Sequence, residues 1–317
     1  KWRYTMLITP DFSTDRPFDK EMLKQDKLIV AYLSKEEMNS FLKEYNIDTI
    51  VMHTLSEPDP IIANTATQNV RYTFSIVDIL NFHSPDQSHD RIGLYLDKHR
   101  LIIVDIEDKD QSTKTAICKS LEDTSIENMD FGKILYHFFY TLIQPHNQIY
   151  GKLQRKIETL DNMILKNETP QGFSSEIMTI NHELLELEDY YDQLVDVIEV
   201  LADNENGLLQ DQNLHFLRNL SNRIERYSNN NDLLRNYLTQ VRDAYDSLIN
   251  LNLNKTMQTF TTITVIFSPL TLIAGWYGMN FKYMPELSHR FGYLYVIFIS
   301  LVVVTGIVYI MKKKKLL

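Results

Sequence analysis

The chain has 317 residues, of which 44% are hydrophobic, and a formal net charge of −10. For so acidic a chain we expect no nucleic-acid partner, because nucleic-acid-binding surfaces are basic. Its one cysteine, Cys118, excludes an intrachain disulfide and is typical of a reduced cytosolic setting.

The first 130 residues combine short β-rich runs with one helical stretch and predict an α/β domain that stays in the cytoplasm. No phosphate-binding glycine loop or zinc-ligand spacing occurs in this sequence, and we expect no enzyme. The histidines are interpreted as structural or surface residues: His53, His83, His89 and His99. The predicted strands are Tyr4–Ile8, Leu28–Leu33, Asp48–Met52, Ile92–Leu96 and Leu101–Ile106, and the predicted helix is Lys35–Tyr45.

A helical hairpin is predicted over residues 131–210. Its first helix begins at Phe131 and ends near 167–172, where Pro170 and Gly172 break the pattern. The second helix has apolar residues at alternating steps of three and four, which is typical of a coiled-coil seam. The seam residues are Ile177, Ile180, Leu184, Leu187, Tyr191, Leu194, Ile198 and Leu201.

The hairpin is strongly acidic. Between Lys166 and Arg218 the chain carries twelve Asp and Glu residues and no Lys or Arg. Two interpretations stay open at this stage: a solvated helical face, or a surface that concentrates cations near a pore.

A third helical run, residues 211–276, has no breaker before Pro269. Its seam again alternates three and four residues, which predicts either self-association or packing on the preceding hairpin. We expect one continuous stalk helix whose last part, about 256–276, crosses a membrane. The seam residues are Leu217, Leu220, Ile224, Tyr227, Asn231, Leu234, Leu238, Val241, Tyr245 and Leu248.

Two uncharged stretches predict two membrane spans. One lies between Lys255 and Lys282 and the other between Arg290 and Lys312, and each is long enough for the roughly 20 apolar residues that a transmembrane helix needs. The second span is residues 291–311, and 312–317 form a basic tail. By the positive-inside rule both termini lie in the cytoplasm, and only the loop 277–290 faces outward.

The sequence around this loop resembles the CorA family of divalent-cation channels, the magnesium transporters of prokaryotes. The resemblance is carried by the triplet Gly278-Met279-Asn280 at the outer end of the first of two C-terminal spans. It is extended by Trp276, Tyr277 and Phe281 and by the run Lys282-Tyr283-Met284-Pro285-Glu286-Leu287. The resemblance implies an α/β cytoplasmic domain, a long α-helical hairpin and stalk, and two C-terminal transmembrane helices in a funnel-shaped homopentamer. It also implies a multi-pass protein of the prokaryotic plasma (inner) membrane.

One face of the first span carries weakly polar residues at helical spacing, and a file of hydroxyls on one face favours a symmetric pore over a lipid-facing surface. Because the face has no carboxylate, we expect Mg²⁺ to pass with its water shell. The pore-lining residues are Asn254, Met257, Phe260, Thr261, Thr264, Ser268, Thr271 and Gly275.

The resemblance assigns further roles. It implies a selectivity filter at Tyr277, Gly278, Met279 and Asn280, a hydrophobic constriction at Met257 and Phe260, and an electrostatic role for Glu286 in the outer loop. It also implies a basic collar formed by Lys312, Lys313, Lys314 and Lys315. The interpretation of these lysines as plain topology signals stays equally open.

The expected function is a channel-like transporter for Mg²⁺, and for Co²⁺ or Ni²⁺, gated by cytosolic divalent cations. Mg²⁺ is then both substrate and regulatory ligand, and no cofactor is expected. A zinc transporter of the same superfamily is the first alternative, although Met279 and Glu286 favour magnesium, and a membrane-anchored coiled-coil scaffold is the second. The regulatory metal ligands stay unknown, because Asn219 stands about where the resemblance implies a carboxylate.

Overall fold

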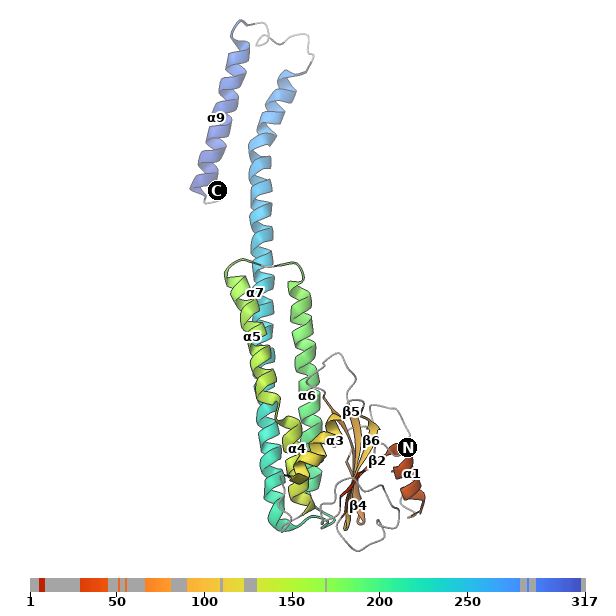
Figure 1. The fold of residues 1–317 in the computed structure, drawn as a ribbon. Coiled ribbons are helices and arrows are strands. Elements are labelled where there is room, and N and C mark those ends of the chain that lie inside the picture. Colours follow the sequence, from red (N-terminus) through yellow and green to blue (C-terminus); the bar gives the residue numbers. More distant parts are fainter. Residues whose placement is uncertain are drawn as a thin grey trace. The chain divides into compact units, whose positions relative to one another are not determined.

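The computed structural model describes residues 6–8, 29–44, 51, 55, 66–80, 90–108, 111–122, 130–168, 170–279, 284 and 289–314. The chain divides into an N-terminal unit, Lys1–Val241, and a C-terminal unit, Arg242–Leu317. In chain order the elements are β1 (Met6–Ile8), β2 (Ile29–Ser34), α1 (Lys35–Glu44), β3 (Ala66–Gln68), β4 (Tyr72–Ile79), β5 (Asp90–Asp97), β6 (Arg100–Glu107), α3 (Ser112–Glu122), α4 (Phe131–Ile143), α5 (His146–Leu165), α6 (Phe173–Asp203), α7 (Asp211–Tyr277) and α9 (Gly292–Lys313) (Figure 1).

The N-terminal unit is built on a six-stranded mixed sheet in the order β1-β2-β6-β5-β4-β3. Strands β2 and β6 are parallel, and the other neighbours are antiparallel. Figure 1 shows α1 on one side of the sheet and α3, α4 and α6 on the other. Strands β2 and β4 are buried along almost their whole length, as expected for a sheet that helices cover on both faces.

The structure confirms the predicted strands at β2, β5 and β6 and the helix at α1, but the sequence reasoning missed β3, β4 and α3. Strand β4 alternates large apolar residues with Thr73 and Ser75, which is a usable strand signal. Both polar residues are nevertheless almost fully buried. The predicted strand Asp48–Met52 is wrong at Val51, which is helical; its other residues lie outside the described part of the chain.

The first helix of the predicted hairpin is two helices. Helix α4 ends at Ile143, and α5 begins at His146 after Pro145, which stands at the N-cap of α5. Proline has no backbone N–H to donate within a helix, so the single helix predicted from Phe131 is wrong at this point. The start at Phe131 is confirmed, and Asp130 caps it by accepting a hydrogen bond of 2.9 Å from the backbone N–H of Gly132.

Helices α5, α6 and the first part of α7 pack together within the N-terminal unit. All eight predicted seam residues of α6 are buried. Of the ten predicted seam residues of α7, seven are buried, and Tyr227, Tyr245 and Leu248 are partly exposed. Three polar contacts fasten the helices: Lys156 to Glu183 at 2.6 Å, Tyr237 to Asp161 at 3.0 Å, and Arg235 to Glu188. Of the two interpretations of the α7 seam, packing on the hairpin is therefore the one observed up to Val241.

The turn between α6 and α7 is closed by one asparagine. Asn204 is the C-cap of α6 and adopts a left-handed conformation with φ of 48°. Its side chain donates to the carbonyl of Leu209 and accepts from the backbone N–H of the same residue, both at 2.9 Å. These two bonds fix the point at which the chain reverses into α7.

Candidate functional site

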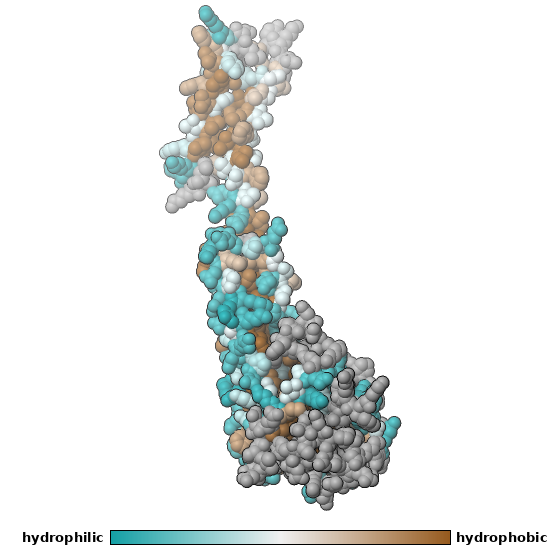
Figure 2. Space-filling view, viewed as in Figure 1, coloured by the Kyte–Doolittle hydropathy of each residue, from teal (hydrophilic) through white to brown (hydrophobic). Residues whose placement is uncertain are grey.

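The C-terminal unit carries two long apolar helices, the last part of α7 and the whole of α9. None of the apolar stretch of α7 is buried by the described residues, and Figure 2 shows hydrophobic surface over both helices. Large side chains such as Phe260, Leu272 and Phe298 are more than 60% exposed. Exposing an apolar surface of this size to water is unfavourable, so the two helices require lipid or other protein chains around them.

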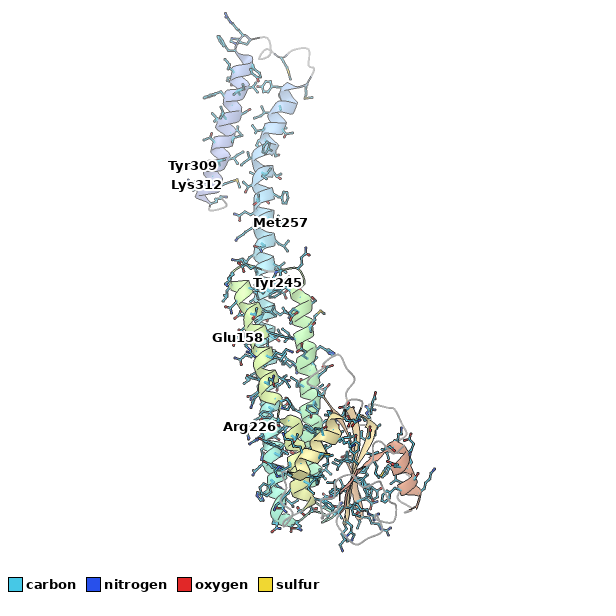
Figure 3. The ribbon with its side chains drawn as sticks, in the orientation of Figure 1. Glu158, Arg226, Tyr245, Met257, Tyr309 and Lys312 are labelled. Carbon is cyan, nitrogen blue, oxygen red and sulfur yellow. The ribbon has the colours of Figure 1, made fainter. Side chains whose placement is uncertain are left out.

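The predicted pore-lining residues all lie on α7 and are exposed. Their three- and four-residue spacing places them on one face of that helix. Figure 3 labels Met257 on α7. The residues are Asn254, Met257, Phe260, Thr261, Thr264, Ser268, Thr271 and Gly275.

Three threonine hydroxyls on this face bond to their own helix. Thr261 donates to the carbonyl oxygen of Met257 at 2.8 Å, and Thr264 and Thr271 donate to the carbonyls four residues before them at 2.9 Å. Each hydroxyl has one hydrogen and two lone pairs. With the hydrogen used inside the helix, the oxygen can only accept hydrogen bonds from outside.

The end of α7 explains why glycine stands at 278. The backbone N–H of Gly278 donates to the carbonyl of Ala274 at 2.9 Å, and that of Met279 donates to Trp276 at 3.3 Å. A Cβ atom on Gly278 would lie 2.9 Å from the carbonyl oxygen of Ala274. Glycine is therefore required by lack of space, because Gly278 is not among the glycines with a positive φ.

Several predicted site residues lie outside the described part of the chain: Asn280, Glu286 and Lys315. Tyr277 is the last residue of α7. Lys312 and Lys313 form the last turn of α9, and Lys314 is its C-cap; Figure 3 labels Lys312 at this end. Lysines at a helix C-terminus are also favoured by the helix dipole, so this placement alone does not show a collar.

Among the described residues, no group of three or more His, Cys, Asp or Glu side chains is arranged to hold a metal ion. The acidic hairpin is partly neutralised inside the N-terminal unit, where Glu183 and Glu188 pair with basic residues of α5 and α7. Asp192 keeps its carboxyl near other carboxylates, and its pKa is raised by burial and by Asp196, Asp189 and Asp232. The Asp192 carboxyl therefore binds its proton more tightly than an isolated carboxyl does.

Known proteins place the chain in a family. The sequence profile described as CorA-like Mg²⁺ transporter protein matches residues 28–314. The chain belongs to this family. CorA-like proteins of this kind are membrane proteins, in accord with the two apolar helices.

Several relatives of the chain are named as transport proteins. The cobalt/magnesium transport protein CorA of Thermotoga maritima is 29% identical over 185 residues, which cover 57% of this chain and 52% of that protein. The putative metal ion transporter YfjQ of Bacillus subtilis is 27% identical over 275 residues, 86% of this chain and 68% of that protein. The match to the Thermotoga protein thus spans about half of that relative's length.

Solved structures share the fold. The CorA magnesium transporter of Methanocaldococcus jannaschii aligns over 98% of both chains with a TM-score of 0.79 and 18% identity. The full-length CmaX protein aligns over 98% of this chain and 97% of its own with a TM-score of 0.75 and 15% identity. The cytoplasmic domain of ZntB from Vibrio parahaemolyticus covers 79% of this chain and 97% of its own, with a TM-score of 0.58 and 11% identity. These likenesses establish the α/β domain, long helices and paired C-terminal helices as a known architecture.

Proposed function

We propose that the chain is a channel-like transporter that conducts Mg²⁺, and also Co²⁺ and Ni²⁺, across a membrane. The observation that carries the proposal is the exposed face of α7, on which Thr261, Thr264 and Thr271 present acceptor-only oxygens and no carboxylate stands. Family membership and the names of the relatives support the same substrate class.

The acceptor-only oxygens suit a cation that keeps its water shell. Shell waters point their hydrogens outward, so they need acceptors, and Mg²⁺ gives up its waters reluctantly. Neutral acceptors hold such a shell without trapping the ion, whereas a carboxylate would bind a divalent cation more strongly. The membrane potential drives the ion inward with about 2.3 kcal/mol per charge per 100 mV, and twice that for a divalent cation.

We assign ion selection to one end of the exposed face of α7 and pore closure to the other end. Tyr277, Gly278, Met279 and Asn280 form the outer filter, with the Asn280 amide oxygen as the main acceptor. Nearer the other end, Met257 and Phe260 form a hydrophobic constriction, which closes by losing its water. The Gly278 backbone fits this arrangement because a side chain there would displace the carbonyl of Ala274.

The transporter is a homopentamer with both termini in the cytoplasm of a prokaryotic cell. Five copies supply the ring that one exposed face cannot form alone. Lys312 to Lys315 mark the cytoplasmic end of α9 and form a basic collar there, and Glu286 lies in the outer loop. Cytosolic divalent cations bind the N-terminal units and favour the closed state; we assign no ligand residues to this site.

Cation uptake into liposomes tests the proposal. Purified full-length protein is reconstituted into liposomes, and a membrane potential that is negative inside is imposed. Entry of Mg²⁺, Co²⁺, Ni²⁺ and Zn²⁺ is then recorded, with protein-free vesicles as the control. The proposal expects Mg²⁺ entry that increases with potential. Entry of Zn²⁺ alone would instead establish the zinc transporter, and no entry of any cation would leave the membrane-anchored scaffold.

A further inference from the structure

Helix α9 has two faces that differ in exposure. Along one face the residues are half-buried or buried, and this face ends at Met311, which is 7% exposed. The last part of α7 has a half-buried face of the same spacing, and Figure 1 shows the two helices beside each other within the C-terminal unit. We therefore infer that these faces meet. They are formed by Val296, Ser300, Val303, Ile307 and Met311 on α9 and by Thr262, Ile266, Leu270 and Ile273 on α7.

The opposite face of α9 is exposed along its whole length. Its residues alternate steps of three and four, so they lie in one row along the helix. The one hydroxyl in the middle of the row, that of Thr305, donates to the carbonyl oxygen of Leu301 at 2.7 Å. We call this row the outer stripe: Tyr295, Phe298, Val302, Thr305, Tyr309 and Lys312.

The composition of the outer stripe is that of a surface in contact with lipid. A tyrosine stands near each end of the row, at Tyr295 and Tyr309, and the residues between them are apolar or bonded within the helix. Tyrosine is enriched at both membrane–water interfaces, because its ring is apolar and its hydroxyl is polar. The Tyr309 side chain is 68% exposed, so its hydroxyl is accessible at the end of the stripe that carries the lysines.

The lysines at the end of α9 divide between the two faces. The backbone N–H of Lys314 donates to the carbonyl oxygen four residues before it at 3.0 Å, so the helical path continues through Lys314. Lys312 and Lys313 follow Tyr309 by three and four residues, which places all three on the outer side. Lys314 follows Met311 by three residues and lies on the side that faces α7.

The two outer lysines have no acidic partner. Neither Lys312 nor Lys313 forms an ion pair with another described residue, and both are exposed. The last carboxylate in the sequence is Glu286, which precedes α9. Figure 3 labels Tyr309 and Lys312 close together on this end of the helix.

The length of α9 sets the depth at which these groups lie. As a helix, the uncharged stretch 291–311 is about 30 Å long, which equals the thickness of the hydrocarbon core of a bilayer. The ammonium groups of Lys312 and Lys313 therefore reach the level of the lipid headgroups, and the Tyr309 hydroxyl lies one turn deeper. Two cations and a hydroxyl donor at this level match the oxygens of a phosphate group.

We propose that Tyr309, Lys312 and Lys313 bind the headgroup phosphate of an anionic phospholipid at the cytoplasmic end of α9. The inference rests on the membrane orientation in the proposed function and adds a lipid ligand to it. It also narrows the basic collar to the lysines on the side that faces α7, such as Lys314.

The net charge of the headgroup decides which lipids the site prefers. A zwitterionic headgroup carries its own cation, which the two lysines repel, whereas an anionic headgroup does not. Each lysine near the surface favours anionic lipid by about fivefold. The helix C-terminus opposes this preference with roughly half a negative charge, which is less than the charge of the two lysines.

Fluorescence quenching by lipid tests the site in the full-length protein. The two tryptophans of the sequence are replaced by phenylalanine, and Thr305→Trp supplies one fluorophore on the outer stripe, about one turn from Tyr309. Phospholipids with brominated acyl chains quench tryptophan on contact, so brominated phosphatidylglycerol and brominated phosphatidylcholine report the lipids next to this position. Stronger quenching by phosphatidylglycerol is expected. Equal quenching by the two lipids, or none by either because another protein chain covers the stripe, overturns the inference.

Three single substitutions of equal charge locate the site. Lys312→Gln and Lys313→Gln are each expected to lower the preference for phosphatidylglycerol by up to about fivefold. Lys314→Gln removes the same charge from the other side of the helix and is expected to leave the preference nearly unchanged. An equal loss in all three variants would show a diffuse attraction to the lysine tail and overturn the site.

Two further measurements separate the lipid from other sources of phosphate and test the hydroxyl. Inorganic phosphate is expected to compete no better than chloride at equal ionic strength; selective competition by phosphate would identify a site for the free anion and overturn the lipid assignment. Tyr309→Phe is expected to reduce the preference by a smaller factor than either outer lysine variant, and an unchanged preference would exclude the hydroxyl from the site.

Cation uptake is recorded on the same liposomes so that the two proposals are judged apart. Uptake without a preference for phosphatidylglycerol at Thr305→Trp contradicts only the lipid site. A lysine-dependent preference without uptake of any cation contradicts only the proposed function.

Discussion

The two parts of α7 each carry a periodic face, and the surroundings of these two faces differ. Before Val241 the three- and four-residue repeat is covered by α5 and α6, and Ile224 and Leu238 are almost completely buried. After Arg242 none of the described residues buries the apolar stretch of α7, and Met257 and Phe260 are 64% and 63% exposed. A periodic face therefore shows that a helix packs against a partner, but it does not identify that partner. In the first part of α7 the partner is the hairpin of the same chain, and in the second part it is lipid or other copies of the chain.

Asparagine and threonine side chains of α7 have different hydrogen-bond partners. In the N-terminal part Asn231 is 2% exposed and donates to the carbonyl of Leu184 at 2.7 Å, so it fixes the register of two helices. In the C-terminal part the hydroxyls of Thr261 and Thr264 bond to their own helix. Hydrogen bonding that is complete within one helix is what a membrane-spanning segment requires.

The largest expected effect is at the outer end of the exposed face. Asn280→Ala should abolish Mg²⁺ uptake in liposomes, because it removes the acceptor that the entering water shell meets first. Asn280→Asp should reduce uptake as well, because a carboxylate holds a divalent ion too strongly to release it. Normal uptake by a folded, assembled Asn280→Ala protein would exclude the filter role.

Matched alanine substitutions test the contrast between the two parts directly. Ile224→Ala should lower the free energy of unfolding of the N-terminal unit by about 2 to 5 kcal/mol, the cost of a cavity in a packed core. Met257→Ala should leave that unfolding transition unchanged and instead raise the leak of cations through the closed channel. Urea denaturation and liposome uptake on both variants give the comparison, which fails if Met257→Ala destabilises as much as Ile224→Ala.

The buried histidine of the bundle predicts a pH dependence confined to the N-terminal unit. His146 is 4% exposed, stacks on Tyr227 with ring centroids 3.6 Å apart, and shares a hydrogen bond of 2.5 Å with the Tyr191 hydroxyl. Burial lowers the pKa of His146 from 6.5 to about 4. Between these values the unfolded chain binds a proton that the folded chain does not, so stability falls as the pH drops from 6.5 to 4, by roughly 3 kcal/mol in all.

Removing both partners of this hydrogen bond supplies the control. The double variant His146→Phe, Tyr191→Phe keeps the aromatic packing without leaving a buried hydroxyl unpaired. The unfolding free energy of this variant should change less between pH 6.5 and pH 4 than that of the unmodified chain. An unchanged pH profile would show that other groups are responsible.

The smallest expected effect concerns a single hydroxyl of the exposed face. Thr264→Val keeps the shape of the side chain and removes the acceptor, so uptake should fall by a few-fold, while Thr264→Ser should keep most of it. Rates measured side by side in liposomes decide the matter. Equal rates for the Val and Ser variants would show that the hydroxyl has no part in conduction.

Helical parts of the fold were predictable from the sequence because their signals are long. The α6 and α7 seams repeat over many turns, and the charge-free stretches after Lys255 and Arg290 exceed the length of a membrane span. Short elements were not: β3 has three residues, and α3 lacks a strong apolar period. The break at Pro145 was not predicted, because the apolar pattern continues on both sides of this proline.

The sequence predicts which residues form the candidate site but not the local chemistry of those residues. Spacing predicts one face for the Thr and Ser residues, and the motif at 278–280 predicts the filter, which stays a prediction. The direction of the threonine hydrogens and the contact between a Gly278 side chain and the Ala274 carbonyl depend on backbone geometry, which a residue pattern does not contain.

The central claim is that a divalent cation crosses with its water shell along acceptor-only oxygens, and competition by cobalt(III) hexaammine tests it most directly. This cation keeps its six ammine ligands, whose hydrogens can donate to the same amide and hydroxyl oxygens. Uptake of Mg²⁺ into liposomes containing the full-length protein is measured as the hexaammine concentration is raised outside. Inhibition that rises with hexaammine and is relieved by excess Mg²⁺ is the predicted result; Mg²⁺ uptake that hexaammine leaves unchanged would contradict passage of a hydrated ion.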